Sequence, residues 1–258
     1  MTVREIIEKL TTLTSPLRYS DGIAAARTLI AVHANSTAVQ RRLPAGWVLA
    51  PYDGDDLRGK AFRGANLLLP FHEVYGVHAA SGPPPGLSQV SYVAFISQAR
   101  RPESGTLTHL HWHAYTEDPA GVPGKYRDSK LAQIRRAQSF IKERRGETEV
   151  RESFSAAADD GSLELSLSFR SGGLLVWATA DHPNLELVAA REPSIERWYQ
   201  EDQVIDVVRS DPMGLDRVSE ISLRVTGDLE DVFDGSERIV GVAIQRPYMR
   251  RVHVPTNQ

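Results

Sequence analysis

Short segments with the two-residue periodicity of β-strands, separated by tight-turn signals, constrain the fold of this chain more than any other feature. Between residues 149 and 178, three such segments are separated by Asp159-Asp160-Gly161 and by Ser171-Gly172-Gly173. Turns of this composition favour β-hairpins, because glycine and aspartate tolerate the backbone conformations that the turn requires. We therefore predict antiparallel strands over 149–156, 163–169 and 174–178.

Apolar or alternating segments elsewhere indicate further strands. They lie at 24–32, 66–78, 89–99, 106–115, 221–225 and 239–245. Residues 129–134 fit a strand or a short helix equally well. The predicted helices are an amphipathic one over 3–10 and a short one over 38–43, which Asn35-Ser36-Thr37 caps and Pro44 ends.

Many strands, few helices and no alternation of strand with helix favour an antiparallel barrel or sandwich over a parallel sheet. The predicted fold class is therefore α+β and mostly antiparallel β. A chain of 258 residues can bury a large core, and we expect one domain over 1–258, with a helix and a loop in residues 1–20.

The composition excludes several kinds of function. The chain has no cysteine, which excludes disulfides, thiolate catalysis and cysteine-bound metal sites. The net charge is −3, and the arginines of the chain are scattered among acidic residues, so we expect no nucleic-acid partner. No segment has the length of a membrane span or the order of a signal peptide, and we expect a cytoplasmic protein without membrane contact.

Several short motifs resemble the acetoacetate decarboxylase-like superfamily. The stretch from His33 to Pro44 resembles its early strand, small helix and Leu-Pro signature. Residues 117–132, which end in Ser129-Lys130-Leu131-Ala132, resemble the segment that carries the family's Pro-Lys-Lys-Leu motif. Phe233-Asp234-Gly235 and the stretch 247–252 are similar to distant members, so the resemblance extends from about residue 24 to 252.

The resemblance implies a cone-shaped β-barrel with an internal pocket, a few peripheral helices and assembly into a homo-oligomer. It also implies chemistry through a lysine Schiff base, without a cofactor or metal. A lysine attacks a carbonyl only when its amine is neutral, and an apolar pocket or a nearby cation favours that form. Activation of this kind in acetoacetate decarboxylase is itself a standard example of the effect.

The chain departs from the family at the residues that matter most for this chemistry. Ser129 stands at the position of the family's nucleophilic lysine, and only the second lysine, Lys130, remains. Gln89 falls where the family has a glutamate, and Ala25 falls where it has an arginine, with Arg27 two residues further on. We therefore assign Lys130 as the candidate amine, Ser129 to the carbonyl end, Gln89 to the position of the acid, and Arg27 to a substrate carboxylate.

Four further residues are assigned to substrate binding: Lys125, Tyr126, His111 and His113. Lys125 is also the reserve amine. His109, His111 and His113 alternate, which in a regular strand places three imidazoles on one face. Such a row suits a metal or a general acid or base, but adjacent members are roughly 7 Å apart, so three in a row would share one ion awkwardly. We assign no metal.

The sequence thus predicts a lyase acting on a β-keto acid or a polyketide-like carbonyl compound, by decarboxylation or by aldol and dehydration chemistry, in secondary metabolism. Two alternatives stay open. One is an enzyme without a Schiff base, a hydrolase, cyclase or isomerase that uses the histidine row. The other is a barrel that binds a small molecule without catalysis. The position of Lys130 distinguishes the Schiff-base enzyme from the binding protein. As an amine catalyst Lys130 should point into the pocket, whereas in a binding protein it should be exposed or paired with an acid.

Overall fold

β-strands form nearly all of the part of the chain that can be described. The computed structural model describes residues 17–54, 62–79, 89–119, 129–142, 147–172, 175–187, 195–210 and 215–255. The predicted helix over 3–10 and the predicted substrate-binding residues Lys125 and Tyr126 lie outside these residues.

The strands are β1 (Leu17–His33), β2 (Val48–Leu49), β3 (Leu67–Ala79), β4 (Val90–Arg100), β5 (Leu107–Thr116), β6 (Ser129–Leu131), β7 (Gln133–Lys142), β8 (Thr148–Ala158), β9 (Gly161–Ser171), β10 (Leu175–Leu187), β11 (Ile195–Ser210), β12 (Leu215–Asp216), β13 (Val218–Gly227) and β14 (Arg238–Pro255). A helix, α2 (Ser36–Arg42), lies between β1 and β2.

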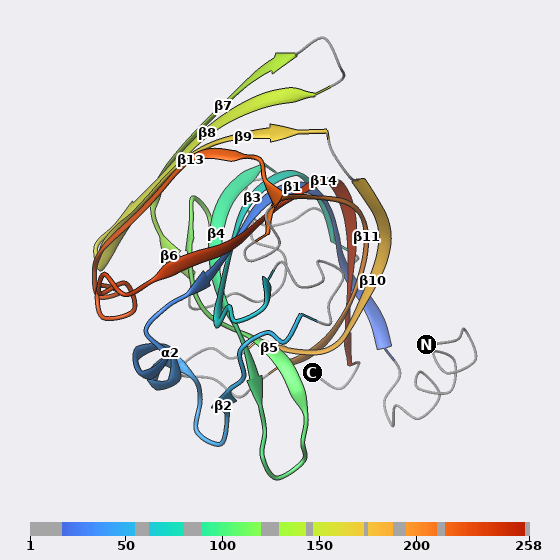
Figure 1. Ribbon diagram of the computed structural model, residues 1–258. Helices are drawn as coiled ribbons and strands as arrows, with labels where there is room; N and C mark the ends of the chain where they lie inside the picture. Colours follow the sequence, from blue (N-terminus) through green and yellow to red (C-terminus); the bar gives the residue numbers. More distant parts are fainter. Residues whose placement is uncertain are drawn as a thin grey trace.

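The described strands form two sheets (Figure 1). The large sheet has ten strands in the order β2-β4-β3-β1-β14-β11-β10-β5-β6, with β12 beside β11. The small sheet has four strands in the order β13-β9-β8-β7. Neighbouring strands are antiparallel except where β5 meets β6 and β10. The predicted mostly antiparallel architecture with few helices is therefore confirmed.

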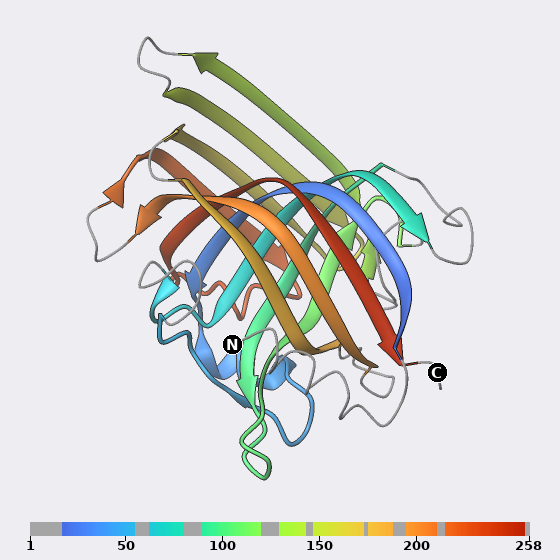
Figure 2. The same cartoon turned by 90° about the vertical axis from the view of Figure 1, so that its right-hand side faces the viewer.

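The large sheet is strongly curled, and β5 is where its ends approach each other. β5 pairs with β4 from Leu107 to Thr116, and it meets β10 at the single parallel pair of His111 with Leu187. The cone-shaped barrel of the sequence prediction is not detected as a closed barrel among the described residues. What the chain does form there is a strongly curled sheet in which β4 and β10 both reach β5, with a second sheet stacked on its outside (Figure 2).

Apolar side chains fill the space between the two sheets. Phe71 of β3 and Phe154 of β8 meet edge to face across it, with ring centroids 4.9 Å apart. A second apolar cluster, which includes Leu29, Leu68 and Phe62, lies on the other face of the large sheet. We call the face toward the small sheet the outer face, and the opposite face, inside the curl, the inner face.

The inter-sheet space also contains a buried ion pair. Glu152 of β8 has a fully buried carboxylate, and Arg136 of β7, whose side chain is only 8% exposed, places Nη2 2.7 Å from Glu152 Oε1. Thr28 of β1 donates its hydroxyl to Glu152 Oε2 at 2.6 Å. A second carboxylate, Glu73 of β3, lies 3.6 Å from Arg136 Nη1. A buried carboxylate is tolerated only when paired and hydrogen-bonded, so this bridge links both sheets at one point.

Helix α2 is held against the large sheet by two asparagines. Asn35 Oδ1 accepts from the backbone N–H groups of Thr37 and Ala38 at 3.1 and 3.2 Å, which confirms the predicted helix cap. The fully buried Asn66 accepts from Ala34 N at 2.8 Å and donates to Ala34 O at 2.8 Å and to Ser36 Oγ. The buried amide thereby satisfies the backbone where β1 ends and the helix begins.

The turn between β8 and β9 is fixed by a close approach to the end of β13. A methyl group added at Gly161 would overlap Thr226 O, and one added at Gly227, whose φ is +85°, would overlap Asp160 O. Only glycine fits at both positions. The backbone therefore determines where Asp160, the middle residue of the predicted hairpin turn, is held.

Candidate functional site

A row of polar side chains crosses five neighbouring strands on the inner face. Pairing across β14, β1, β3, β4 and β5 aligns Gln245, Arg27, His72, Tyr92 and Thr116 in one row. Side chains opposite one another across neighbouring strands project to the same face. All but Arg27 are buried, with exposed fractions of 2% or less, and Arg27 is half-buried. We call these five residues the inner polar row.

Contacts within the inner polar row are specific. Arg27 Nε donates a hydrogen bond to Gln245 Oε1. The rings of His72 and Tyr92 are stacked, with centroids 4.2 Å apart. A half-buried guanidinium with a planar set of donors is suited to bind a carboxylate in a bidentate manner. The row therefore supplies a cation for an acidic ligand, at the residue predicted to bind the substrate carboxylate.

Ser129 and Lys130, which are consecutive in strand β6, lie on opposite faces of the large sheet. The parallel register with β5 places Ser129 beside Ala114 and Lys130 beside Tyr115. Tyr115 belongs to the core between the sheets, so Lys130 is directed to the outer face and Ser129 to the inner face. Ser129 Oγ is buried and has no hydrogen-bond partner among the described residues. With Arg27 and His111, it is one of three predicted site residues that the strand registers direct to the inner face.

Lys130 is half exposed and lies near an acid. Its side chain is 49% exposed, and Nζ lies 3.9 Å from Asp160 Oδ2 in the β8–β9 turn. This is the environment that we expected for a lysine in a binding protein, which should be exposed or paired with an acid. An exposed pair of this length contributes little to stability.

A cluster of buried polar groups surrounds Asp160 on the outer face. His113 and Tyr115 of β5 meet edge to face with ring centroids 4.7 Å apart. His113 Nε2, Tyr115 Oη and Asp160 Oδ1 are buried and make no hydrogen bond of standard geometry within the described part of the chain. Burial first, and the Asp160 carboxylate second, raise the pKa of Tyr115 well above its ordinary value. The phenol therefore stays protonated and remains a donor.

The charge of His113 provides a test of this cluster. Burial lowers the pKa of His113 to about 4, although Asp160 acts in the opposite direction. An unfolded chain takes up this proton near pH 6.5, whereas the folded chain takes it up only near pH 4. Stability from a neutral His113 is therefore complete above pH 6.5 and decreases as the pH falls toward 4, by at most about 3 kcal/mol.

We expect His113→Gln to reduce the loss of stability between pH 7 and pH 4.5, measured as the change in the free energy of unfolding in urea. Other groups also titrate in this range, so the comparison is between the slopes of the two proteins. Equal slopes in wild type and variant would show that His113 is not held neutral.

The three histidines of β5 do not share a face. The register with β4 shifts between the pairs Phe95 with His113 and Ile96 with His111, which leaves Trp112 as an extra residue. Phe95 faces the core between the sheets, whereas Ile96 packs on the inner cluster. This bulge therefore directs His113 outward and His111 inward, and the expectation of three imidazoles on one face is wrong. Among the described residues, no group of three or more His, Asp or Glu side chains is placed to hold a metal ion.

Gln89, the predicted counterpart of the family's acid, is exposed and immediately precedes β4. It lies three residues before Tyr92 of the inner polar row. His72, Tyr92, Thr116 and Gln245 were not predicted as site residues. No local motif marks them, because their alignment depends on pairing between strands that are distant in the sequence.

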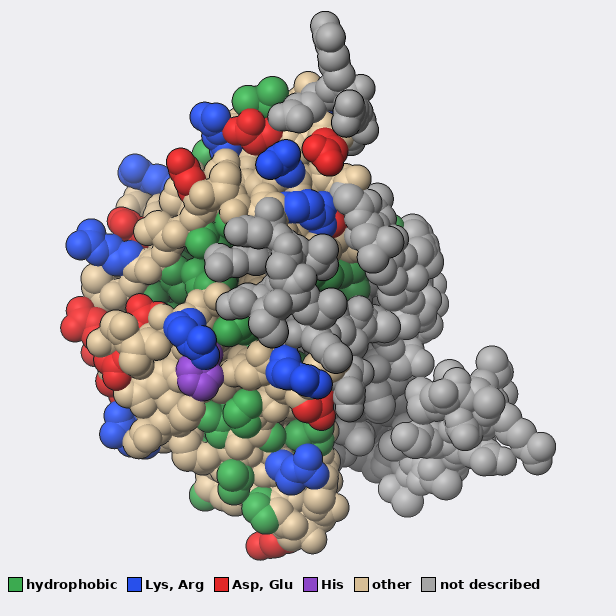
Figure 3. Space-filling model, viewed as in Figure 1, with side chains coloured by type: hydrophobic (Ala, Val, Ile, Leu, Met, Phe, Trp, Pro, Cys, Tyr) green, Lys and Arg blue, Asp and Glu red, His purple; other side chains and the backbone are tan. Residues whose placement is uncertain are grey.

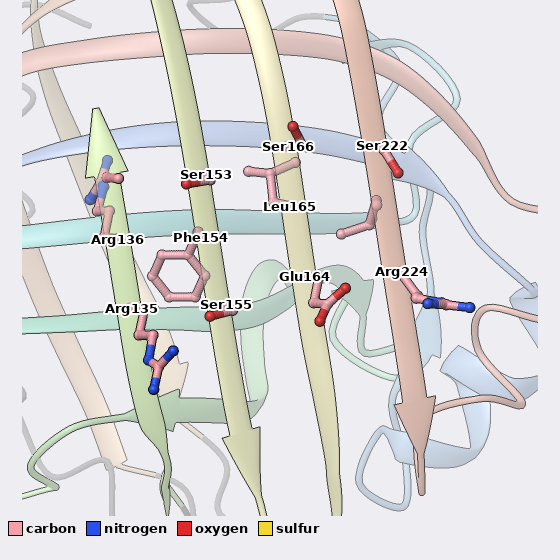
Figure 4. Close-up of a pocket in the computed structure, with 12 residues that line it drawn as sticks. Arg135, Arg136, Ser153, Phe154, Ser155, Glu164, Leu165, Ser166, Ser222 and Arg224 are labelled. Atoms are coloured by element: carbon pink, nitrogen blue, oxygen red, sulfur yellow. The ribbon is translucent and has the colours of Figure 1, made fainter. Parts of the chain in front are cut away.

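A hollow of about 740 Å³ lies elsewhere, on the exposed face of the small sheet (Figure 4). Its floor is made by serines of three adjacent strands, including Ser153, Ser166 and Ser222, and Arg135 and Arg224 lie at its two edges. None of the predicted site residues lines it.

On the face seen in Figure 3, the described cations and anions are interspersed, in agreement with the absence of a basic stripe in the sequence.

Solved structures identify the fold. Over 94% of its length the chain is similar to an acetoacetate decarboxylase-like enzyme from Sphingomonas wittichii RW1, with a TM-score of 0.53, 10% identity and 92% of that chain covered. It is also similar to the enduracididine biosynthesis enzyme MppR with HEPES buffer bound, with a TM-score of 0.51, 14% identity, and 94% of this chain and 87% of that chain covered.

The same enzyme complexed with pyruvate gives a TM-score of 0.50 at 14% identity, with 94% and 90% of the two chains covered. The chain therefore has the acetoacetate decarboxylase-like fold, and the resemblance seen in the sequence is confirmed at the level of the fold. No protein-family model and no curated protein matches the sequence. No helix in the described residues is long and apolar enough to cross a membrane.

Proposed function

We propose that the chain is an acetoacetate decarboxylase-like lyase that acts on a β-keto acid or a related polyketide-like carbonyl compound, by decarboxylation or by aldol and dehydration chemistry. The substrate binds on the inner face of the large sheet. The observation that carries the proposal is the inner polar row, which places one half-buried cation, Arg27, among buried polar side chains. The fold supports it, because a protein of this fold binds the oxo acid pyruvate.

Three residues of the inner face have separate roles in this proposal. Arg27 binds the substrate carboxylate, and Gln245 orients the guanidinium through the hydrogen bond from Nε. The hydroxyl of Ser129, which has no partner among the described residues, donates to the carbonyl oxygen. In decarboxylation the bond to CO₂ breaks and its electron pair moves to that oxygen, so a donor there stabilises the charge that develops.

The sequence also predicts an amine step at Lys130. There the neutral amine would add to the carbonyl carbon, water would leave, and the resulting imine would accept the electron pair. This step remains a prediction. The position of Lys130 on the outer face, beside Asp160, favours chemistry without a Schiff base.

The same observation favours a second candidate function, in which the inner face binds a carbonyl acid without converting it. Neither candidate requires a cofactor. Assembly into a homo-oligomer and a cytoplasmic location belong to the proposal as well, because both follow from the family resemblance and the sequence.

Borohydride trapping tests the proposal. The protein is incubated with a panel of β-keto acids and 2-oxo acids, product and CO₂ release are measured, and intact mass and peptide mapping follow borohydride treatment. We expect turnover of at least one acid, no adduct at Lys130, and retention of that turnover in Lys130→Ala.

A borohydride-stable adduct at Lys130, with loss of turnover in Lys130→Ala, would instead establish amine catalysis. Binding of an acid without turnover would support the second function, and the absence of both binding and turnover across the panel would overturn the proposal.

A further inference from the structure

The hollow on the exposed face of the small sheet is built from two neighbouring rows of outward-facing side chains (Figure 4). Strand pairing aligns one side chain from each of β7, β8, β9 and β13 in each row. The first row is Ala137, Ser153, Ser166 and Ser222, and the second is Arg135, Ser155, Glu164 and Arg224. We call the space above these eight residues the serine-lined hollow.

Small side chains give the serine-lined hollow its depth. The first row consists of alanine and serine alone, whereas the longer arginines of the second row stand on the two outer strands. Adjacent strands are about 4.8 Å apart, so the backbones of Arg135 and Arg224 are separated by roughly 14 Å across the sheet. A volume of about 740 Å³ is in the range of sites that hold a small organic molecule.

Serine is an unexpected residue at so many positions of a sheet face. Strands favour β-branched and aromatic residues, so threonine and not serine is the usual small hydroxyl residue. The four serines make no side-chain hydrogen bond within the described part of the chain, so hydrogen bonding there does not explain them. Sequences depart from local preference mainly at functional sites, and four free hydroxyl groups on three adjacent strands are suited to a polar ligand.

The charges of the second row differ between its two ends. Arg224 lies directly opposite Glu164, whereas the outward neighbours of Arg135, on β7 itself and on β8, are all uncharged. None of these three side chains forms an ion pair with another described residue. A guanidinium without an acid beside it is suited to bind an oxyanion in a bidentate manner. The carboxylate of Glu164 only accepts hydrogen bonds, so it favours a ligand that also carries donors.

We propose that the serine-lined hollow binds a sugar that carries one oxyanion group, a phosphate or a carboxylate. The oxyanion accepts hydrogen bonds from Arg135 and from the hydroxyl of Ser155, which lies opposite it. The sugar hydroxyls both donate and accept, so they pair with the serine hydroxyls and donate to Glu164.

The nature of the lining favours a sugar over an apolar or aromatic ligand. Phe154, Leu165 and Leu223 also line the hollow, but they pack in or against the core between the sheets. The described side chains that face the ligand therefore include no aromatic ring on which a base could stack. The site is separate from the inner polar row and does not depend on the proposed reaction.

Calorimetric titration tests the class of ligand, with glucose-6-phosphate, glucuronate, glucose and inorganic phosphate as the probes. We expect glucose-6-phosphate or glucuronate to bind about tenfold more tightly than glucose and inorganic phosphate, because only these two probes contact Arg135 and the serines together. The tighter of the two identifies the oxyanion as phosphate or carboxylate. Absence of binding by both, or equally tight binding of inorganic phosphate, would overturn the proposal.

Arg135→Gln tests the oxyanion contact and is expected to weaken binding of the tighter probe by about tenfold. The matched control is Arg151→Gln, which removes the same charge from the same face. Arg151 lies outside the hollow and is already paired with Glu149 at 2.8 Å, so the affinity should stay unchanged. Equal weakening in both variants would mean a general effect of net charge. Loss of binding in Arg27→Ala in place of Arg135→Gln would move the ligand to the inner face, and either result would overturn the proposal.

Ser166→Tyr tests the hollow itself, because a ring at the centre of the first row fills the space that the sugar needs. Ser166 is exposed and tyrosine favours strands, so the free energy of unfolding in urea should not fall. We expect binding to be lost in Ser166→Tyr and retained in Ser139→Tyr, which places the same ring on the same face outside the hollow. Undiminished binding in Ser166→Tyr would show that the ligand lies elsewhere.

Discussion

Arg136→Ala is expected to lower the free energy of unfolding by about 3–5 kcal/mol, because it leaves the carboxylate of Glu152 buried without its counter-charge. Glu152 is fully buried, and Thr28 supplies only one neutral hydrogen bond to it. The measurement is urea unfolding at a fixed protein concentration, followed by circular dichroism. The adjacent Arg135→Ala is the matched control, since Arg135 is exposed on the other face of β7, and its effect should stay within about 0.5 kcal/mol.

The double variant Arg136→Met with Glu152→Gln separates loss of the pair from loss of packing. If the buried charge is responsible, removing both charges should recover most of the stability lost in Arg136→Ala. A double variant as unstable as Arg136→Ala would mean that the arginine acts through its packing and not through its charge.

Arg27→Ala is expected to weaken binding of the oxo acid identified in the substrate panel by about 10- to 100-fold, which corresponds to the roughly 1.5–3 kcal/mol of a hydrogen bond to a charged group. The cause is loss of the guanidinium from the inner polar row, where Arg27 is the predicted carboxylate ligand. The dissociation constant is measured by calorimetry. Arg27→Lys keeps the charge but loses the bidentate geometry, so its affinity should fall between those of wild type and Arg27→Ala.

Arg224→Ala on the exposed face of the small sheet is the matched control, because it removes the same charge from the serine-lined hollow. Equal weakening by Arg27→Ala and Arg224→Ala would mean a general effect of net charge. Weakening by Arg224→Ala alone would move the binding site to the serine-lined hollow.

Local signals predicted much of the fold. The hairpin turn at Asp159-Asp160-Gly161 and the helix cap at Asn35 are encoded within a few residues, so sequence alone was sufficient to find them. Strand β11 was missed, because its central residues, Gln200 to Gln203, are all polar or charged and interrupt the apolar pattern. Strand β7 was also missed beyond Ile134, because its second half is exposed on both faces and shows no alternation of apolar and polar residues.

The candidate site was less predictable, because it depends on which strands become neighbours. Arg27 was predicted from the family resemblance, but nothing near it in the sequence indicates that Gln245, 218 residues away, would accept its hydrogen bond. The face to which Lys130 points follows from the register of β6 with β5. Asp160, which lies beside Lys130, was considered only as part of a turn. Register between distant strands is a tertiary property, and a single sequence does not contain it explicitly.

The extra residue in β5 has a consequence for how chains of this fold can diverge. Because Trp112 is an extra residue in β5, the alternation of side chains between the two faces is reversed from one half of the strand to the other, so that His111 and His113 lie on opposite faces. Each half still supplies side chains to both faces. Two related chains that differ by one residue here would align in sequence while presenting opposite sets of side chains to a ligand.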